Sequence, residues 1–220
     1  MVAVVLFFVG QILAGEPATG TGTILRQVWN GAGGNSVADL ASSEDFPNYP
    51  EESSLLQSFE APTDSADNYG ALIRGYVHPP QSGNYIFWIA SDDNGELWIS
   101  SSEDPAQKKL IAQVGEWTMP RDWEKFPAQK SQPVQLQAGR KYYIEARHKE
   151  GFGGDNLAVG WQLPDGKQER PIPGSRLSAF VPPKPAPRTP KPPPTTAGHH
   201  RRRIEHKVGD KTIKMPYLLY

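Results

Sequence analysis

The stretch from Tyr85 to Ser100 constrains the fold more than any other part of this sequence. It reads YIFWIASDDNGELWIS, with two runs of β-branched and aromatic residues around a short polar segment. Such runs favour strands, and Asn94-Gly95 is the pair that tight two-residue turns prefer, because both positions accept a positive φ. The pattern predicts a β-hairpin, with the adjacent acids Asp92 and Asp93 at the end of its first strand.

The pair Asp92-Asp93 has two interpretations. Aspartate readily caps and turns a chain, so both side chains fit solvated turn positions. Two neighbouring carboxylates also repel each other, and a hard cation such as Ca²⁺ would relieve that repulsion. From this stretch alone, turn formation is the favoured interpretation.

The remaining sequence up to residue 180 contains short apolar or alternating runs, separated by Gly, Pro and Asn turns, and no long amphipathic helix. Strands are expected at 24–29, 69–79, 109–114, 133–136, 141–150, 157–163 and 172–180, with a weaker one at 59–62. We expect 141–150 and 157–163 to pair with each other, each with one apolar face. Short strands at such spacing predict an all-β fold, an antiparallel β-sandwich of jelly-roll-like type.

Charge and composition exclude several functions. The sequence has no cysteine, so it has no disulfide framework and no zinc-thiolate site. Residues 181–220 hold nine Lys and Arg and two Asp and Glu, which leaves 14 basic and 22 acidic residues in 1–180, a net charge of -8. An acidic globular part argues against nucleic-acid binding and is compatible with cation binding.

Both ends differ from the central domain, which we place at 19–181. Residues 1–18 are interpreted as a signal peptide, because their apolar run has the length of a signal-peptide hydrophobic region. A buried first strand or helix is the alternative. Residues 182–203 are a proline-rich basic linker, and 204–220 contain one strand, at 212–220, interpreted as the truncated start of a following domain. We therefore expect a secreted or cell-surface protein (periplasmic or extracellular), with no membrane span after signal cleavage.

A second loop changes the interpretation of the two aspartates. Residues 150–156 read EGFGGDN and join two of the expected strands. Glycines let backbone carbonyls approach a ligand, and Ca²⁺ takes about six to eight oxygens from carboxylates, amides, carbonyls and water. Asp92 and Asp93 together with this loop provide most of such a set, so a cation site becomes the favoured interpretation.

These segments resemble the protective-antigen fourteen-kilodalton-type domain, a β-sandwich of anthrax protective antigen, yeast flocculins and epithelial adhesins, bacterial adhesins and glycosidase inserts. The resemblance covers roughly residues 22–180. The segments that carry it are 69–76, 82–99, 138–146 and 155–161.

The resemblance implies a calcium site. In lectin members of that family, two adjacent aspartates joined by a cis peptide hold Ca²⁺, which ligates vicinal sugar hydroxyls. The matching residues here are Asp92 and Asp93. The second loop of the family contributes side-chain and carbonyl oxygens, and Gly154, Asp155 and Asn156 match that region.

Specificity in the family comes from variable loops. We nominate Trp117, Trp123 and Phe152 as platforms on which a sugar would stack, with core packing as the alternative role. Asp92, Asp93 and Asn156 complete the expected ligand-binding set. For His148-Lys149-Glu150, beside the second loop, we expect a supporting or structural role.

The sequence therefore predicts a secreted, calcium-dependent, lectin-like module that binds a glycan or polysaccharide and belongs to a larger multidomain protein. One alternative is a structural or protein-interaction sandwich without sugar binding. Another is an accessory domain of a truncated secreted hydrolase. We do not expect an enzyme, because adjacent aspartates cannot flank a glycosidic bond as an acid/base pair does.

Overall fold

The computed structural model describes residues 20–187, 203–208 and 211–216. The chain divides into two units, residues 1–184 and 185–220. The expected signal peptide and most of the expected linker lie outside the described residues. No helix among those that the structure describes is long and apolar enough to cross a membrane.

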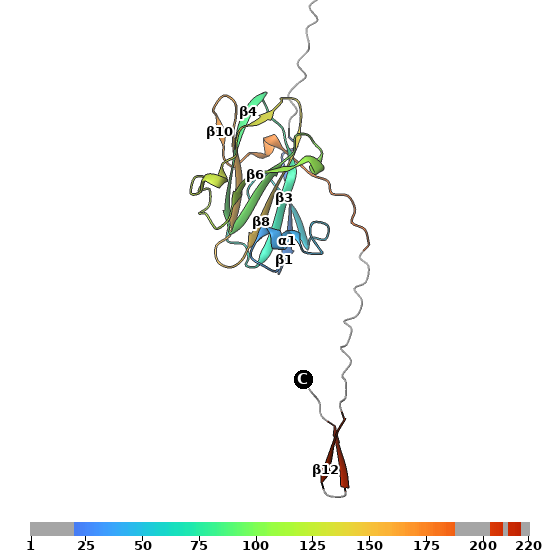
Figure 1. Ribbon diagram of the computed structural model, residues 1–220. Coiled ribbons are helices and arrows are strands. Elements are labelled where there is room, and N and C mark those ends of the chain that lie inside the picture. Colours follow the sequence, from blue (N-terminus) through green and yellow to red (C-terminus); the bar gives the residue numbers. More distant parts are fainter. Residues whose placement is uncertain (1–19, 188–202, 209–210, 217–220) are drawn as a thin grey trace, which may run out of the picture. The chain divides into compact units, whose positions relative to one another are not determined.

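The first unit is a sandwich of two antiparallel sheets (Figure 1), which confirms the predicted fold class. In the larger sheet the strand order is β2-β1-β3-β8-β5-β6, and β11 pairs with one end of β3. The smaller sheet has the order β10-β9-β4-β7. The strands of the larger sheet are β1 (Ile24–Asn30), β2 (Glu52–Leu56), β3 (Tyr69–Val77), β5 (Asn94–Ile99), β6 (Lys109–Val114), β8 (Tyr142–Glu150) and β11 (Leu177–Ala179). Those of the smaller sheet are β4 (Gly83–Asp92), β7 (Val134–Leu136), β9 (Asn156–Gln162) and β10 (Gln168–Glu169).

The core consists of the inward faces of both sheets. Its buried members include Ile73, Leu97, Ile144 and Ala146 from the larger sheet and Tyr85, Phe87, Ile89, Val159 and Trp161 from the smaller one. Burial of each large apolar side chain contributes about 1.5–3 kcal/mol, so this layer supplies most of the driving force for folding. The inward faces predicted for 141–150 and 157–163 are confirmed.

The predicted hairpin is wrong, although both of its strands exist. β4 pairs with β9 and β7, whereas β5 pairs with β8 and β6, so the chain crosses from one sheet to the other between Asp92 and Asn94. Asn94 and Gly95 lie within β5 and do not form a turn. A Cβ on Gly95 would lie 2.6 Å from the Cβ of Ser91, so this glycine permits the close approach of the two layers.

The pairing predicted between 141–150 and 157–163 is wrong for the same reason. β8 pairs with β3 and β5, and β9 pairs with β4 and β10, so residues 151–155 form a second crossing between the sheets. The register places Asp92 opposite Asn156 and Asn94 opposite Lys149. Both crossings therefore lie at the same end of the sandwich.

Smaller elements differ in part from expectation. β2 was not anticipated, and the weak strand expected at 59–62 forms only an isolated bridge at Glu60. The helices are α1 (Val37–Ala41) and the 3₁₀ turns η1 (Pro105–Gln107), η2 (Pro127–Gln129) and η3 (Gly174–Arg176). In the second unit, β12 (Arg203–Val208) pairs with β13 (Lys211–Pro216). The strand expected at 212–220 thus has a partner, and residues 217–220 lie outside the described part.

Candidate metal centre

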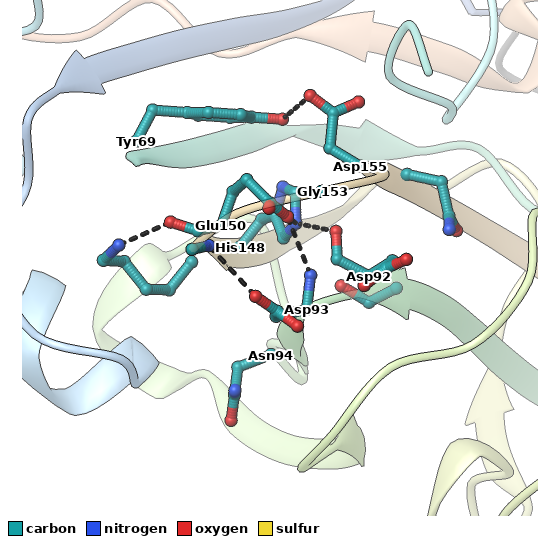
Figure 2. Close-up of polar contacts among 12 residues, drawn as sticks. Tyr69, Asp92, Asp93, Asn94, His148, Glu150, Gly153 and Asp155 are labelled. Carbon is teal, nitrogen blue, oxygen red and sulfur yellow. Dashed lines mark hydrogen bonds and ion pairs between the residues drawn. The ribbon is translucent and has the colours of Figure 1, made fainter. Parts of the chain in front are cut away.

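Three carboxylates meet where the two crossings lie side by side (Figure 2). Asp92 ends β4, Asp93 follows it, and Glu150 ends β8; ligand oxygens from all three lie within 4.8 Å of one another. Only Glu150 is fully buried. The tertiary fold thus brings together acids that are 57 positions apart in sequence.

Backbone and imidazole groups fix these side chains. The amide of Asp93 donates to Oε2 of Glu150 (3.0 Å), and the amide of Gly151 donates to Oδ2 of Asp93 (3.0 Å). Nε2 of His148 donates to the carbonyl of Asp92 (2.7 Å), because a carbonyl can only accept. The peptide bond between Asp92 and Asp93 is cis.

The cluster is electrostatically unfavourable without a cation. Burial, followed by the neighbouring Asp93 carboxylate, raises the pKa of Asp92 to about 6 and that of Glu150 to about 7. Burial lowers the pKa of His148 to about 4, so this imidazole is neutral near pH 7 and adds no positive charge. A divalent ion would favour the charged form of both carboxyls and so oppose the burial and the repulsion that raise their pKa values.

The donor set fits a hard cation. Oε1 of Glu150 and Oδ1 of Asn156 are buried and have no hydrogen-bond partner, while Nδ2 of Asn156 donates to the carbonyl of Thr118 (2.8 Å). This bond leaves the amide oxygen of Asn156, opposite Asp92, as the free end of the side chain. The available ligands are all oxygens, which is what Ca²⁺ and similar ions prefer.

Two glycines keep space open beside the carboxylates. A Cβ on Gly151 would lie 3.0 Å from Oδ2 of Asp93, and a Cβ on Gly154 would lie 3.6 Å from Oδ2 of Asp92. Side chains at these positions would fill the space next to the acids. Gly154 therefore lies close to Asp92, and its carbonyl stays a predicted ligand of the ion.

The carboxylate of Asp155 faces away from the cluster. It accepts hydrogen bonds from the amides of Ser65 and Ala66, the hydroxyl of Ser65 and the hydroxyl of Tyr69, the last of which is drawn in Figure 2. Burial alone would raise the pKa of Asp155, but these donors lower it. The structure therefore gives this side chain a role in anchoring the chain around residue 65.

The three predicted aromatic platforms occupy different surroundings. Trp117 forms an isolated β-bridge with Asp92 and is 47% exposed, and Phe152, in the second crossing, is 83% exposed. Trp123 is half-buried, with the guanidinium of Arg170 5.9 Å from its ring centre. Trp117 and Phe152 are thus exposed residues on segments that adjoin the acidic cluster. Met119 is a further exposed apolar residue, which the sequence analysis did not identify.

Glu150 is the residue that sequence reasoning placed outside the site. It was grouped with His148 and Lys149 as supporting, whereas it supplies one of the three clustered carboxylates. Its position as the last residue of a strand that enters the glycine-rich loop was the available signal.

A separate cavity of about 430 Å³ lies at the other end of β8, lined by His78, Arg140, Lys141 and Tyr142 among others. None of the predicted site residues lines it. The acidic cluster and the cavity are therefore distinct features.

The fold and site together define a β-sandwich with an acidic, oxygen-lined centre where two inter-sheet crossings meet. The family model described as "PA14 domain" matches residues 36–175, more than half of the sequence. The chain belongs to the PA14 domain family, as the sequence resemblance indicated.

Two curated relatives are long proteins. The chain is 40% identical over 134 residues to mouse N-acetyl-beta-glucosaminyl-glycoprotein 4-beta-N-acetylgalactosaminyltransferase 1, covering 59% of this chain and 13% of that protein. It is 30% identical over 141 residues to mouse fibrocystin, covering 59% of this chain and 3% of that protein. The match is thus a small part of each relative.

Solved structures share the fold. The PA14 sugar-binding domain from an RTX adhesin has a TM-score of 0.55 at 13% identity, covering 72% of this chain and 98% of that domain. The epithelial adhesin 9 A domain from Candida glabrata, in complex with Galβ1-4GlcNAc, has a TM-score of 0.51 at 14% identity, covering 74% and 94%. At such identities the likeness shows the architecture alone.

Proposed function

We propose that this chain is a secreted or cell-surface, calcium-dependent carbohydrate-binding module that attaches a larger multidomain protein to glycans. The observation that carries the proposal is the cluster of Asp92, Asp93 and Glu150, whose carboxylate oxygens lie close enough together to bind one ion. Gly151 and Gly154 have no side chains to fill the space beside these oxygens. Trp117, which forms a bridge with Asp92, and Phe152, two residues after Glu150, are both exposed. The sugar-binding domains among the structural neighbours support the ligand class.

The proposal divides the residues of the centre into those that bind the ion and those that position its ligands. Asp92, Asp93 and Asn156 would hold the ion through side-chain oxygens, and Gly154 through its carbonyl. When bound, Ca²⁺ supplies open coordination positions for the vicinal hydroxyls of a sugar. Glu150 positions the amide of Asp93 and offers its free Oε1 to the same space. Asp155 stays a predicted ligand, but its hydrogen bonds favour a positioning role.

The side chains beside the centre provide apolar contact area. Trp117 is held against Lys125, whose Nζ lies 3.3 Å from the ring centre and donates to the carbonyl of Trp117. One face of this indole is thus covered by a cation, while the residue as a whole is 47% exposed.

A single sugar held in this way should bind weakly, at about millimolar Kd or about -4 kcal/mol. Useful affinity would come from several copies or from tethering within a larger protein. The short match to long relatives supports such a modular arrangement.

Binding to a glycan array in Ca²⁺ and in chelator tests this proposal. We expect the full chain to bind neutral glycans in Ca²⁺ and to lose them in chelator, and Asp93→Asn to remove binding while its circular dichroism spectrum stays unchanged. Glycan binding that persists in chelator, or in Asp93→Asn, would contradict the calcium mechanism.

We also propose that the chain binds without catalysing a reaction. Asp92 and Asp93 are adjacent in sequence, so they cannot flank a glycosidic bond as the two carboxylates of glycoside hydrolysis do. Incubation with glycosides and with sugar nucleotides should release no product above the rate of the Asp92→Ala/Asp93→Ala variant. Turnover lost in that variant would refute this part of the proposal.

A further inference from the structure

A third loop, which no sequence argument singled out, borders the acidic cluster. The Asp64 loop (residues 63–68) is attached to the second crossing at several points. The amide of Asp64 donates to the carbonyl of Asp155 (3.0 Å), and the amide of Asn68 donates to the carbonyl of Gly151 (2.6 Å). The amide of Gly153 donates to Oδ1 of Asp67 (3.0 Å). These bonds hold the loop in one position beside the site.

The side chain of Asp64 reaches the space next to Asp92. A Cβ on Gly154 would lie 3.3 Å from Oδ1 of Asp64 and 3.6 Å from Oδ2 of Asp92. Both carboxylates therefore border the same small volume, with only a glycine between them. Asp64 is exposed, which places it at the rim of the site, and its backbone has a positive φ of 50°.

This arrangement makes the surroundings of the centre strongly negative. Six carboxylates lie on the three connections: Asp64, Asp67, Asp92, Asp93, Glu150 and Asp155. The lysines that act on them are Lys125, stacked on Trp117, and Lys149, whose Nζ donates to the carbonyl of Glu150. Both ammonium groups are already engaged. Arg26 adds one further positive charge, over the ring of Tyr69. A divalent ion, two lysines and this arginine balance five of the six negative charges and leave the group negative.

We propose that this site selects uncharged glycans over acidic ones, and that Asp64 is a specificity-determining residue. The inference rests on the proposed function. Asp64 accepts hydrogen bonds from hydroxyls of a sugar held at the centre, since an ionised carboxylate only accepts. The same carboxylate repels a sialic acid, uronic acid or sulfate group, because like charges a few ångströms apart destabilise each other.

The test compares matched pairs of glycans in saturating Ca²⁺ at pH 7.5. Each pair contains a neutral glycan and the same glycan with a terminal sialic or uronic acid. Binding is measured for the full chain, for Asp64→Asn and for Asp165→Asn. Asp165→Asn removes the same charge in the turn after β9, at the end opposite Asn156. Calcium affinity of each variant is measured by calorimetry.

We expect the unmodified chain to prefer the neutral member of each pair by about tenfold or more, equivalent to about 1.4 kcal/mol. Asp64→Asn should retain calcium binding and lose most of that preference, and Asp165→Asn should change neither. A preference for acidic glycans, or an unchanged preference in Asp64→Asn, would overturn the inference.

A second readout separates this inference from the proposed function. Cationic and anionic nitroxide cosolutes report the local potential through their unequal relaxation of the Gly153 amide in calcium-saturated protein. A negative potential that weakens in Asp64→Asn supports the electrostatic premise of the inference, so that a failure to bind any glycan on the array would then count against the proposed function and not against this premise. A neutral or positive potential there would overturn it.

Discussion

Glu150 is the residue whose ionisation most affects this site. Its pKa of about 7 exceeds the ordinary glutamate value because it is buried beside Asp93, so the folded chain binds a proton that the unfolded chain has released by pH 6.5. The resulting stabilisation of the metal-free chain is complete only below the unfolded pKa of about 4.5 and is lost as pH rises through the folded pKa, so its last part is lost between pH 6.5 and 8.

The opposite contribution of His148 restricts the test to that range. Its pKa of about 4 lies below the unfolded value, so its protonation destabilises the fold at lower pH and stability rises up to about pH 6.5. Above pH 6.5 the carboxyl effect remains. The carboxyl contribution lost between pH 6.5 and 8 is about 1 kcal/mol, so we expect Tm to fall by about 2–4 °C over that range in chelator. Glu150→Gln should flatten the profile, and a flat profile in the unmodified chain would argue against the raised pKa.

Asp155 joins the second crossing to the Asp64 loop. Asp155→Ala leaves the donors of Ser65, Ala66 and Tyr69 without their acceptor, which should lower the free energy of unfolding by about 1–3 kcal/mol. Urea unfolding of the full chain measures this loss, with Asp165→Asn as the charge control. Equal stability of Asp155→Ala and the unmodified chain would contradict the stabilising role of this carboxylate.

The acidic residues of the site differ in how well the sequence alone predicts their roles. Asp92 and Asp93 were found from their adjacency, which is a local signal. The sequence did not place Glu150 in the cluster or predict the hydrogen bonds of Asp155, because which groups a carboxylate faces depends on which loop packs against it. That packing joins residues about 90 positions apart, such as Ser65 and Asp155.

At the scale of elements, the strands and their inward faces were predicted, whereas two of their pairings were not. Alternation along β8 and β9 fixes which side chains face the core, because the side-chain period of a strand is two. It does not say which neighbouring strand completes the hydrogen bonds. Both errors assigned a hairpin where the chain crosses between sheets, and those crossings build the site.

Gly95 tests the first crossing directly. A methyl group on it would lie 2.6 Å from both Cβ and Oγ of Ser91, so Gly95→Ala should destabilise the fold by about 1–3 kcal/mol through overpacking. Gly115→Ala is the matched control, because no atom lies within 4 Å of its added carbon. Chemical denaturation of both variants gives the comparison, and equal effects would contradict the proposed close approach of the layers.

At the scale of the whole molecule, the sandwich presents its acidic centre at one end of the strands. The chain matches only a small part of each long relative. This agrees with the proposed module, whose weak binding to one sugar would be strengthened by tethering within a larger protein. The boundaries predicted for the signal segment, the linker and a following domain remain predictions.

Calorimetric titration of Ca²⁺ into the chelator-stripped full chain, compared with the Asp92→Ala/Asp93→Ala variant, tests the central claim most directly. We predict binding at one site in the unmodified chain and none in the variant. No heat of binding in either protein, or the same binding in both, would contradict the claim and return Asp92 and Asp93 to the role of turn residues.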